Sequence, residues 1–308
     1  MTDLNLELHN KLKKIKKVFN TSKIISRVSN LKTIARYYKV NKLFYTIFVS
    51  NDNFIHMGIS RSGKLVKSDL LEHAKLVEKY IIKISKVTHV LELATGRGAT
   101  SAYLAEKYPN IRFDAVDLPD GQLDYAIRKS KKLINFKPVT GDYHDLSKYK
   151  NNTFDLIFII EALCHSTNKD MVFKEVKRVL KKRGVFIIFD GYSGKKDIDL
   201  TKEQILAKKL TEKGMMVNNF DYYPDIKRKL IVSGFKIIEE EDVSMLIIPT
   251  LKKYDNITKI FFSLPISFLK FIIRIVPEDL INNFLSGAFL PTLIKMKIAN
   301  YMITVVES

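Results

Sequence analysis

Hydrophobic and polar positions follow two different patterns along this chain of 308 residues. Up to about residue 85, apolar positions recur every three or four residues in "LHNKLKKIKKVF" (8–19) and "SDLLEHAKLVEKYIIKI" (68–84). This spacing places them on one side of an amphipathic helix. The stretch "IFVSNDNFIHMGISRSGKL" (47–65) is rich in Asn, Ser and Gly and predicts a loop. We therefore expect a helical N-terminal cap over residues 1–70.

From residue 88 onward, short apolar runs alternate with helical periods. The apolar runs predict strands over 89–94, 112–118, 136–142, 154–160, 184–192, 234–243 and 300–308. The helical periods cover 100–109, 121–133, 169–184 and 201–232. Strands that are apolar on both faces are typical of a parallel sheet covered by helices on both sides. The pattern predicts an α/β fold with a doubly wound, seven-stranded, mostly parallel sheet over residues 71–308, with ligands at the carboxyl ends of the strands.

A helical insertion is expected at about 244–298, before the last strand. Its segment "ITKIFFSLPISFLKFIIRIVPEDL" (257–280) is apolar at helical spacing and carries Lys and Arg on another face. Either it packs as a lid over a pocket or it lies at a membrane interface. Its longest apolar run, 260–269, is bounded by Lys259 and Lys270 and is too short to span a bilayer.

Charge is unevenly placed. The net charge is +19, and residues 1–42 hold eleven Lys and Arg against Asp3 and Glu7. Such a field attracts the phosphates of nucleic acid or anionic lipid, or simply forms a solvated surface. The single cysteine, Cys164, excludes a disulfide framework, and no signal-peptide pattern is visible at the N-terminus. We expect a cytoplasmic protein and keep a peripheral membrane position as a hypothesis.

The stretch "VLELATGRGATS" (90–101) is an apolar strand that runs into a glycine-rich turn. Gly96 and Gly98 let the backbone approach a ligand, and the helix that follows directs its N–H groups toward a carboxylate or phosphate. Asp117 ends the second strand, where a carboxylate accepts hydrogen bonds from both ribose hydroxyls. These features alone fit a nicotinamide dinucleotide as well as S-adenosylmethionine.

Glu92 distinguishes between the two ligands. A carboxylate at this position meets the ammonium group of a methionine moiety but repels a pyrophosphate. The segments "GDYHDL" (141–146) and "FDLIFIIEALCH" (154–165) follow in the expected places. Over residues 70–243 the sequence resembles the class I S-adenosylmethionine-dependent methyltransferases.

The resemblance implies a Rossmann-like methyltransferase fold with S-adenosylmethionine as methyl donor. His144, Glu161 and His165 do not have the spacing of a recognised metal-ligand set, so we expect no metal. Ala94 stands where the family usually has its first glycine. The residues implied to bind the donor are Glu92, Ala94, Gly96, Gly98, Asp117, Leu118, Asp142, Tyr143 and Glu161.

Two further segments restrict the resemblance to one group of enzymes within this family. "IIEALCHS" (159–166) resembles the corresponding stretch of sterol C24-methyltransferases and of related enzymes acting on tocopherol, quinone or phosphoethanolamine-type substrates. "NDNFIHMG" (51–58) resembles the N-terminal lid of that group and places His56 over the donor. The resemblance implies a small, lipid-like or isoprenoid acceptor.

Three residues are catalytic candidates: Glu161, His165 and Tyr192. Glu161 and His165 follow the fourth strand and act either as a general base and cation stabiliser or only as a pair that fixes the loop. The ring of Tyr192 offers a face to a sulfonium or to the acceptor.

Other functions remain open at this stage. The +19 charge suggests RNA methylation, but "EALC" stands where amino-methylating enzymes of nucleic acid carry Asn/Asp-Pro-Pro-aromatic, so nucleic acid is not the expected partner. A non-catalytic lipid- or membrane-binding relative and a hydride-transfer enzyme are further alternatives. The expected partners are a hydrophobic small molecule and an anionic membrane surface, and the oligomeric state stays open.

Overall fold

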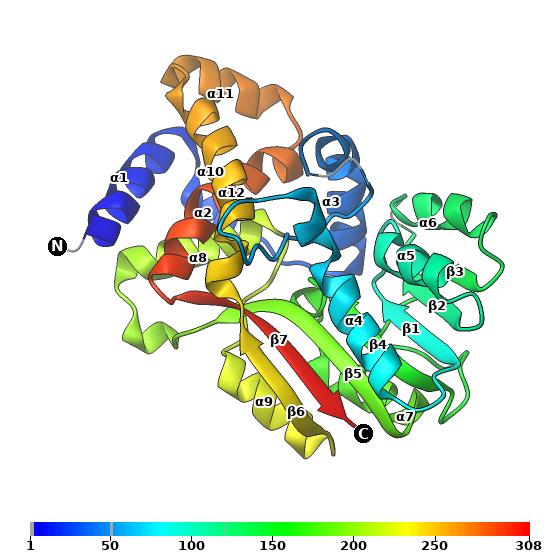
Figure 1. Ribbon diagram of the computed structural model, residues 1–308. Helices are drawn as coiled ribbons and strands as arrows, with labels where there is room; N and C mark the ends of the chain where they lie inside the picture. The colour runs from blue at the N-terminus through cyan, green and yellow to red at the C-terminus, as the bar shows by residue number, and fades with distance from the viewer. Residues whose placement is uncertain (1–2, 50–51, 120) are drawn as a thin grey trace.

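The computed structural model describes residues 3–49, 52–119 and 121–308, and seven strands form one sheet at its centre (Figure 1). The strands are β1 (His89–Leu93), β2 (Arg112–Asp117), β3 (Phe136–Thr140), β4 (Phe154–Ile160), β5 (Leu180–Ser193), β6 (Lys236–Asp242) and β7 (Ala299–Glu307). Their order is β3-β2-β1-β4-β5-β7-β6, and only β7 runs antiparallel to its neighbours. The predicted doubly wound, mostly parallel sheet is confirmed.

Helices cover both faces of the sheet, because the strands are buried on both sides. On one face lie α4 (Glu72–Lys83), α5 (Ala99–Lys107) and α6 (Leu123–Ser130), and on the other lie α7 (Lys169–Val179) and α9 (Tyr223–Val232). Phe113 and Phe158 belong to the first core, while Leu91 and Ile157 belong to the second. Successive residues of a strand thus point to opposite faces of the sheet and belong to two separate hydrophobic cores.

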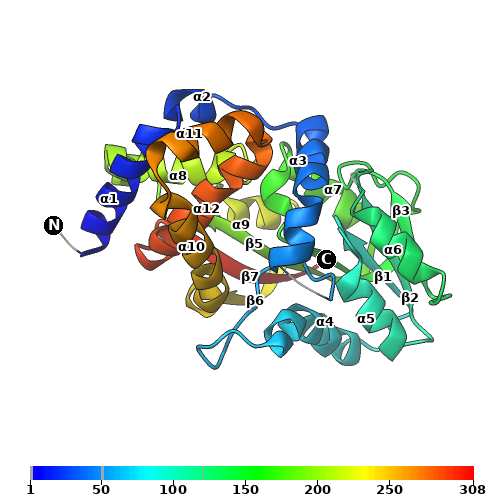
Figure 2. The same ribbon diagram turned by 90° about the horizontal axis from the view of Figure 1, so that it is seen from above.

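The N-terminal helices lie beside the helices that precede β7, although the sequence separates them widely (Figures 1 and 2). The first group is α1 (Asp3–Val18), α2 (Thr21–Ile25), α3 (Leu31–Phe44) and a π-helical turn (Tyr45–Val49). The second group is α10 (Ile248–Ser263), α11 (Ile266–Ile275) and α12 (Glu278–Lys295), with α8 (Lys202–Gly214) beside them. α12 packs against α1, α3, α8 and α10, so both groups together form one cap over the sheet. The helical insertion before the last strand is confirmed, whereas the boundary at residue 70 stays a prediction.

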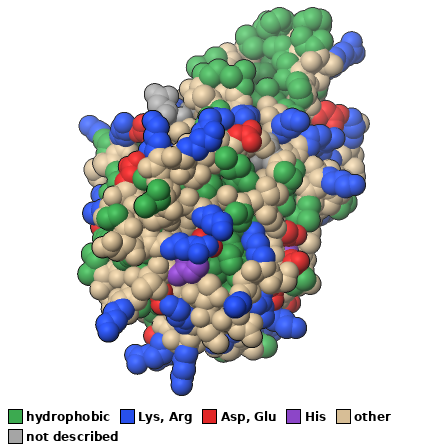
Figure 3. Space-filling model, turned by 90° about the vertical axis from the view of Figure 1, so that its right-hand side faces the viewer, with side chains coloured by type: hydrophobic (Ala, Val, Ile, Leu, Met, Phe, Trp, Pro, Cys, Tyr) green, Lys and Arg blue, Asp and Glu red, His purple; other side chains and the backbone are tan. Residues whose placement is uncertain are grey.

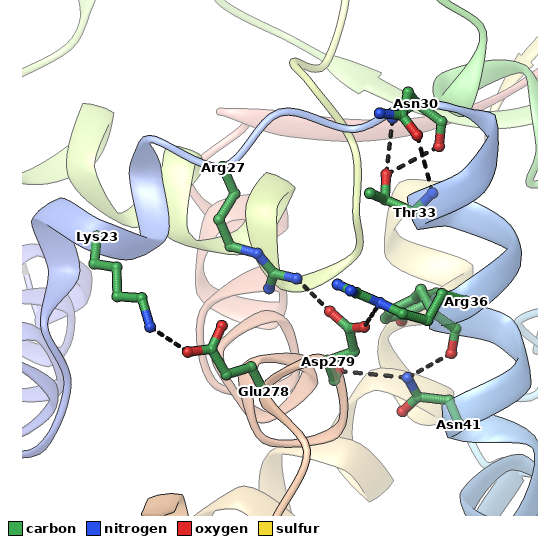
Figure 4. A network of polar contacts seen from close by, with 9 residues as sticks. Lys23, Arg27, Asn30, Thr33, Arg36, Asn41, Glu278 and Asp279 are labelled. Carbon is green, nitrogen blue, oxygen red and sulfur yellow. Dashed lines mark hydrogen bonds and ion pairs between the residues drawn. The ribbon is translucent and has the colours of Figure 1, made fainter.

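A buried carboxylate ties the two groups together (Figure 4). Asp279, in the first turn of α12, is buried and forms ion pairs with Arg27 and Arg36. Its backbone oxygen accepts a hydrogen bond of 3.4 Å from Asn41 Nδ2. Because a buried carboxylate is stable only when it is paired, this cluster holds the start of α12 against α3.

Some element boundaries differ from the predictions. The helix expected over 169–184 ends at Val179, and β5 begins at Leu180, paired with Phe154. The helical stretch 201–232 is interrupted between α8 and α9, where Met216 has a positive φ of 56°. The expected loop 47–65 begins inside the π-helical turn, and its residues 50–51 lie outside the described part of the chain.

No single described helix is long and apolar enough to cross a membrane. The segments Ser244–Ser263 and Ile266–Ile275 reach that length and hydropathy only as a pair, and the pair bends by 111°.

Candidate functional site

A large cavity lies where the carboxyl ends of the parallel strands meet the helical cap. The space between the lining residues is about 2070 Å³ with the open mouth included. Ala94 follows β1, Asp117 ends β2, Glu161 follows β4 and Tyr192 lies near the end of β5, and all four line the cavity. The position agrees with the expected ligand site of a doubly wound sheet.

Glu92 lies at the inner end of this cavity. The residue is buried, and Thr95 Oγ1 donates a hydrogen bond of 2.6 Å to its Oε2. Burial raises the pKa of Glu92 to about 7 from its usual 4.5. A cationic group placed beside this carboxyl would stabilise its ionised form.

The glycine turn wraps around Asp117. One carboxylate oxygen accepts a hydrogen bond from Gly96 N, and the other accepts one of 2.7 Å from Leu118 N. These hydrogen bonds fix the Asp117 carboxylate at the end of β2, where it lines the cavity. Gly96 has a positive φ of 56°, and a Cβ added there would lie 3.0 Å from Ile55 Cδ1 of the N-terminal segment.

Asp142 is the next acid along the edge of the sheet. Its Oδ1 accepts hydrogen bonds from His144 N at 2.9 Å and from His144 Nδ1 at 2.6 Å. Burial raises the pKa of Asp142, but the hydrogen bonds from His144 outweigh burial and hold this pKa below its usual value. The ring of Tyr143 stacks on that of His144, and Tyr143 Oη donates to Ala162 O at 3.0 Å.

Glu161 receives hydrogen bonds from two distant segments. Met57 N donates to Oε1 at 2.8 Å, and Tyr301 Oη donates to the same oxygen at 2.9 Å. Burial raises the pKa of Glu161 to about 7 from its usual 4.5. The backbone of Glu161 has a positive φ of 50°, an uncommon conformation for a residue other than glycine. Glu161 therefore combines a strained backbone with a carboxyl group poised near neutral pH.

A buried histidine lies behind Tyr301. His73 Nε2 is 3.0 Å from Tyr301 Oη, and the His73 ring lies 4.1 Å from the ring of His56. Burial lowers the pKa of His73 well below its usual value and that of His56 to about 4. Because Tyr301 donates its proton to Glu161, the neutral His73 donates Nε2–H to Tyr301. His73 and Tyr301 thus orient the carboxyl group of Glu161.

His165 is held between the cap and the sheet. Its Nδ1 lies 3.3 Å from Met216 O, and its Nε2 lies 3.0 Å from Tyr38 Oη in α3. A carbonyl only accepts hydrogen bonds, so Nδ1 carries the proton and Nε2 accepts from Tyr38. Burial lowers the pKa of His165 to about 4, which keeps the ring neutral.

Aromatic side chains dominate the rest of the wall. Seven of the fourteen tyrosines line the cavity: Tyr37, Tyr38, Tyr45, Tyr143, Tyr192, Tyr254 and Tyr301. Tyr192 is buried, and its hydroxyl has no hydrogen-bond partner among the described residues. Aromatic faces attract cations, and their bodies bury apolar ligands.

The charges in the wall have a single sign. Five carboxylates line the cavity: Glu92, Asp117, Asp142, Glu161 and Asp190. None of the described lining residues is Lys or Arg, although the chain has 52 of them and a net charge of +19. The interior is therefore suited to a cation, while the outer surface carries the positive charge.

Comparison with known proteins agrees with this geometry. Residues 91–188 match the model of a family described as "Methyltransferase domain". The chain is 35% identical over 105 residues to a sterol methyltransferase-like protein of Botryococcus braunii, which is 33% of this chain and 26% of that protein. It is 28% identical over 190 residues to a sterol 24-C-methyltransferase of Schizosaccharomyces pombe, which is 58% of this chain and 48% of that protein. The matched part thus spans between a quarter and a half of these relatives.

The chain contains a class I S-adenosylmethionine-dependent methyltransferase domain. Its fold is also that of the cyclopropane synthase MmaA2 of Mycobacterium tuberculosis. That structure has a TM-score of 0.73 at 12% identity, and the match covers 92% of this chain and all of the other.

The methyltransferase domain brings most of the predicted site residues together. Glu92, Ala94, Gly96, Asp117, Leu118, Asp142, Tyr143, Glu161, His165 and Tyr192 all line the cavity. Gly98 does not, because its missing Cβ makes room for α6 and β3 instead: a Cβ there would lie 2.7 Å from Ala126 Cβ and 2.9 Å from Phe136 Cζ. His56 lines the cavity as expected of a lid residue, whereas Asn51 of the same stretch lies outside the described residues.

Sequence reasoning missed the partners that the cap supplies to the methyltransferase domain. Tyr38 and Tyr301 were not predicted as site residues, and no local motif marks either. The insertion, by contrast, lines the cavity as its predicted alternative of a lid over a pocket requires: it contributes Leu251, Tyr254, Ile257 and Thr258 of α10, together with Asn283, Phe284 and Gly287 of α12. Phe261 and Phe262 are buried in the cap, while Phe268 and Phe271 are exposed, so these four do not line the cavity.

In the described part of the chain, no three His, Cys, Asp or Glu side chains gather in a metal-binding arrangement.

Proposed function

We propose that this protein transfers a methyl group from S-adenosylmethionine to a small, apolar, lipid-like acceptor. The observation that carries the proposal is the wall of the cavity, which combines five carboxylates with seven tyrosines and has no Lys or Arg among its described residues. Such a wall favours a sulfonium donor and an acceptor that becomes positively charged during the reaction.

The residues along the first three strands fit the donor. The buried Glu92 carboxyl accepts a hydrogen bond from Thr95, lines the cavity and suits the ammonium group of the methionine moiety. Asp117 suits the ribose hydroxyls, since its carboxylate is a hydrogen-bond acceptor that ends β2 and lines the cavity. Asp142 Oδ2 has no hydrogen bond from a described residue and suits the amino group of adenine, with Tyr143 beside it.

When bound, the donor supplies a methyl group on a positively charged sulfur. The chain's part is to align the acceptor with that methyl group, exclude water and stabilise the positive charge as it moves to the acceptor. The faces of tyrosine rings such as Tyr192 suit that charge. Glu161, ionised above its raised pKa, takes the proton that the methylated acceptor releases.

An apolar acceptor follows from the remaining wall. The parts contributed by α3, α10 and α12 are chiefly Ile, Leu, Phe and Tyr side chains. The absence of a cation among the described lining residues disfavours a phosphorylated acceptor, including RNA, because nucleic-acid sites are rich in Lys and Arg. We further propose that the protein works in the cytoplasm at a membrane, where such acceptors dissolve.

Incubation with methyl-deuterated S-adenosylmethionine tests the proposal. The purified protein is mixed with a total lipid extract or with total RNA, and mass spectrometry locates the label. We expect the label in an organic-soluble product and not in RNA, and we expect Asp117→Ala to abolish labelling. Label in RNA, or none in either fraction, would overturn the proposal.

A further inference from the structure

Helix α11 has three distinct sides. Leu269, Ile272, Ile273 and Val276 face the core of the cap. Phe268, Phe271 and Ile275 follow each other at helical spacing and are 48%, 56% and 64% exposed. Lys270 and Arg274, four residues apart, form a neighbouring basic stripe that is also exposed.

The exposed apolar side is not isolated. Ile260, in the last turn of α10, is 71% exposed, and Ile266 at the start of α11 is 40% exposed. Figure 3 shows hydrophobic side chains gathered at the top of the molecule, where Figure 1 places α11, with Lys and Arg around their base. We call Ile260, Ile266, Phe268, Phe271 and Ile275 the α11 patch. Large apolar patches on a protein surface mark binding sites, because exposing them to water is unfavourable.

Charge complementarity identifies the partner. Lys270 and Arg274 form no ion pair with a described residue, and α1 beside α11 exposes Lys13, Lys14, Lys16 and Lys17. A second copy of this chain, with its charge of +19, would be repelled from such a surface. An apolar helix side flanked by cations is instead the arrangement of a helix that lies in the interface of an anionic bilayer.

We propose that the α11 patch inserts into the surface of an anionic lipid bilayer and docks the protein there. The geometry connects this surface to the cavity. Tyr254, Ile257 and Thr258 of α10 line the cavity, and Ile260 follows them on the same helix and belongs to the patch. The ion pairs of Asp279 hold the start of α12, just beyond the end of α11, against α3 and the connection between α2 and α3. The docking itself does not depend on the proposed function. Its benefit does, because docking would let an apolar acceptor enter the cavity from the bilayer.

Vesicle flotation tests the docking without any methyl transfer. The full chain is mixed with vesicles of phosphatidylcholine alone or of phosphatidylcholine with phosphatidylglycerol. We expect binding to the anionic vesicles to be at least about tenfold stronger, and to weaken at high salt. Phe268→Glu/Phe271→Glu should weaken binding by at least about tenfold.

The matched control is Ile134→Glu/Ile198→Glu, which changes the net charge equally at two sites that are 106% and 90% exposed and lie outside the α11 patch. This control should bind vesicles as the unchanged protein does. Unaltered thermal melting and S-adenosylmethionine binding establish that each variant is folded. Sedimentation velocity tests the alternative that a second copy of this chain, and not a bilayer, covers the α11 patch.

Three results would overturn the docking proposal. They are vesicle binding that survives Phe268→Glu/Phe271→Glu, equal losses in the control variant, and a dimer that only the α11 variant breaks while vesicle binding is absent. Failure of methyl transfer with intact vesicle binding would instead contradict the proposed function alone.

Discussion

Tyr38 Oη and His165 Nε2 are 3.0 Å apart, although 127 residues separate Tyr38 and His165 in the sequence. The contact joins the N-terminal cap to the segment that follows β4, and both residues line the cavity. Because the cap completes the site, a change in the position of the cap also changes the geometry in which the reaction takes place.

Tyr38→Phe tests that coupling. The variant keeps the ring but removes the hydroxyl that donates to His165 Nε2, so His165 loses one of the two hydrogen bonds that fix its orientation. We expect kcat/KM for methyl transfer to fall about tenfold, with little change in the melting temperature. Tyr103→Phe, on α5 and outside the cavity lining, is the matched control. Equal activity of Tyr38→Phe and the unchanged protein would show that the contact has no role in the reaction.

The pH dependence of activity tests Glu161. Its pKa is raised to about 7, so the carboxylate that accepts the proton forms only as the pH rises through that value. We expect kcat to increase from pH 6 to a plateau above about pH 8. Glu161→Gln should lose most of the activity and all of this pH dependence. A pH-independent kcat in the unchanged protein would contradict the role of Glu161 as the general base.

The same raised pKa has a consequence for stability. An acid whose pKa is higher in the folded state contributes stability below its usual pKa of 4.5 and loses that contribution as the pH rises through about 7. Glu161→Gln removes this loss, so the variant should be more stable than the unchanged protein at pH 8 and not at pH 4. Urea unfolding at the two pH values measures the difference. The opposite order would mean that the ionised carboxylate is well stabilised in the fold.

Tyr301→Phe should shift the pH profile itself. The Tyr301 hydroxyl donates to Glu161 and thereby favours the carboxylate, which lowers its pKa against the effect of burial. Without that donor, the midpoint of the kcat profile should move upward by about half a unit to one unit. Tyr143→Phe, whose hydroxyl donates to Ala162 O, should leave the midpoint in place. A midpoint unchanged by Tyr301→Phe would remove Tyr301 from the positioning of Glu161.

Substitutions at two glycines distinguish the energetic cost of backbone strain from the cost of close packing. Gly98 and Gly63 both have positive φ, of 71° and 77°, but only a Cβ on Gly98 meets neighbouring atoms closer than 3.0 Å. Gly63→Ala should therefore cost about 1 kcal/mol of unfolding free energy from strain alone. Gly98→Ala should cost about 3 kcal/mol, because overpacking against Ala126 and Phe136 is added. Chemical denaturation of the two variants checks the difference, and equal costs would exclude a packing role for Gly98.

The sheet could be predicted from sequence because its central strands β1, β2, β4 and β5 are buried on both faces and are therefore nearly continuous apolar runs. The end of α7 could not, because Lys181 and Lys182 continue the polar pattern of the helix and only the pairing of Leu180 with Phe154 turns the chain into β5. That pairing joins residues far apart in sequence, which periodicity does not encode.

The side of the site that we propose for the donor could also be located from sequence, since Glu92, Gly96 and Asp117 stand at fixed positions relative to their strands and all three line the cavity. The acceptor side was not. Tyr301 reaches Glu161 from 140 residues away, and only the antiparallel β7 places it there. Gly98 belongs to the same motif as Gly96, but its neighbours in space show that its role is to fit α6.

Donor binding tests the central claim most directly. Isothermal titration calorimetry of the full chain with S-adenosylmethionine should give a single site, and Asp117→Ala should weaken the affinity at least about tenfold, because the ribose contact and the support of Gly96 are both lost. Asp145→Ala, an exposed acid that does not line the cavity, should bind as the unchanged protein does. The absence of any binding heat across temperatures, or equal affinity in Asp117→Ala, would contradict the account.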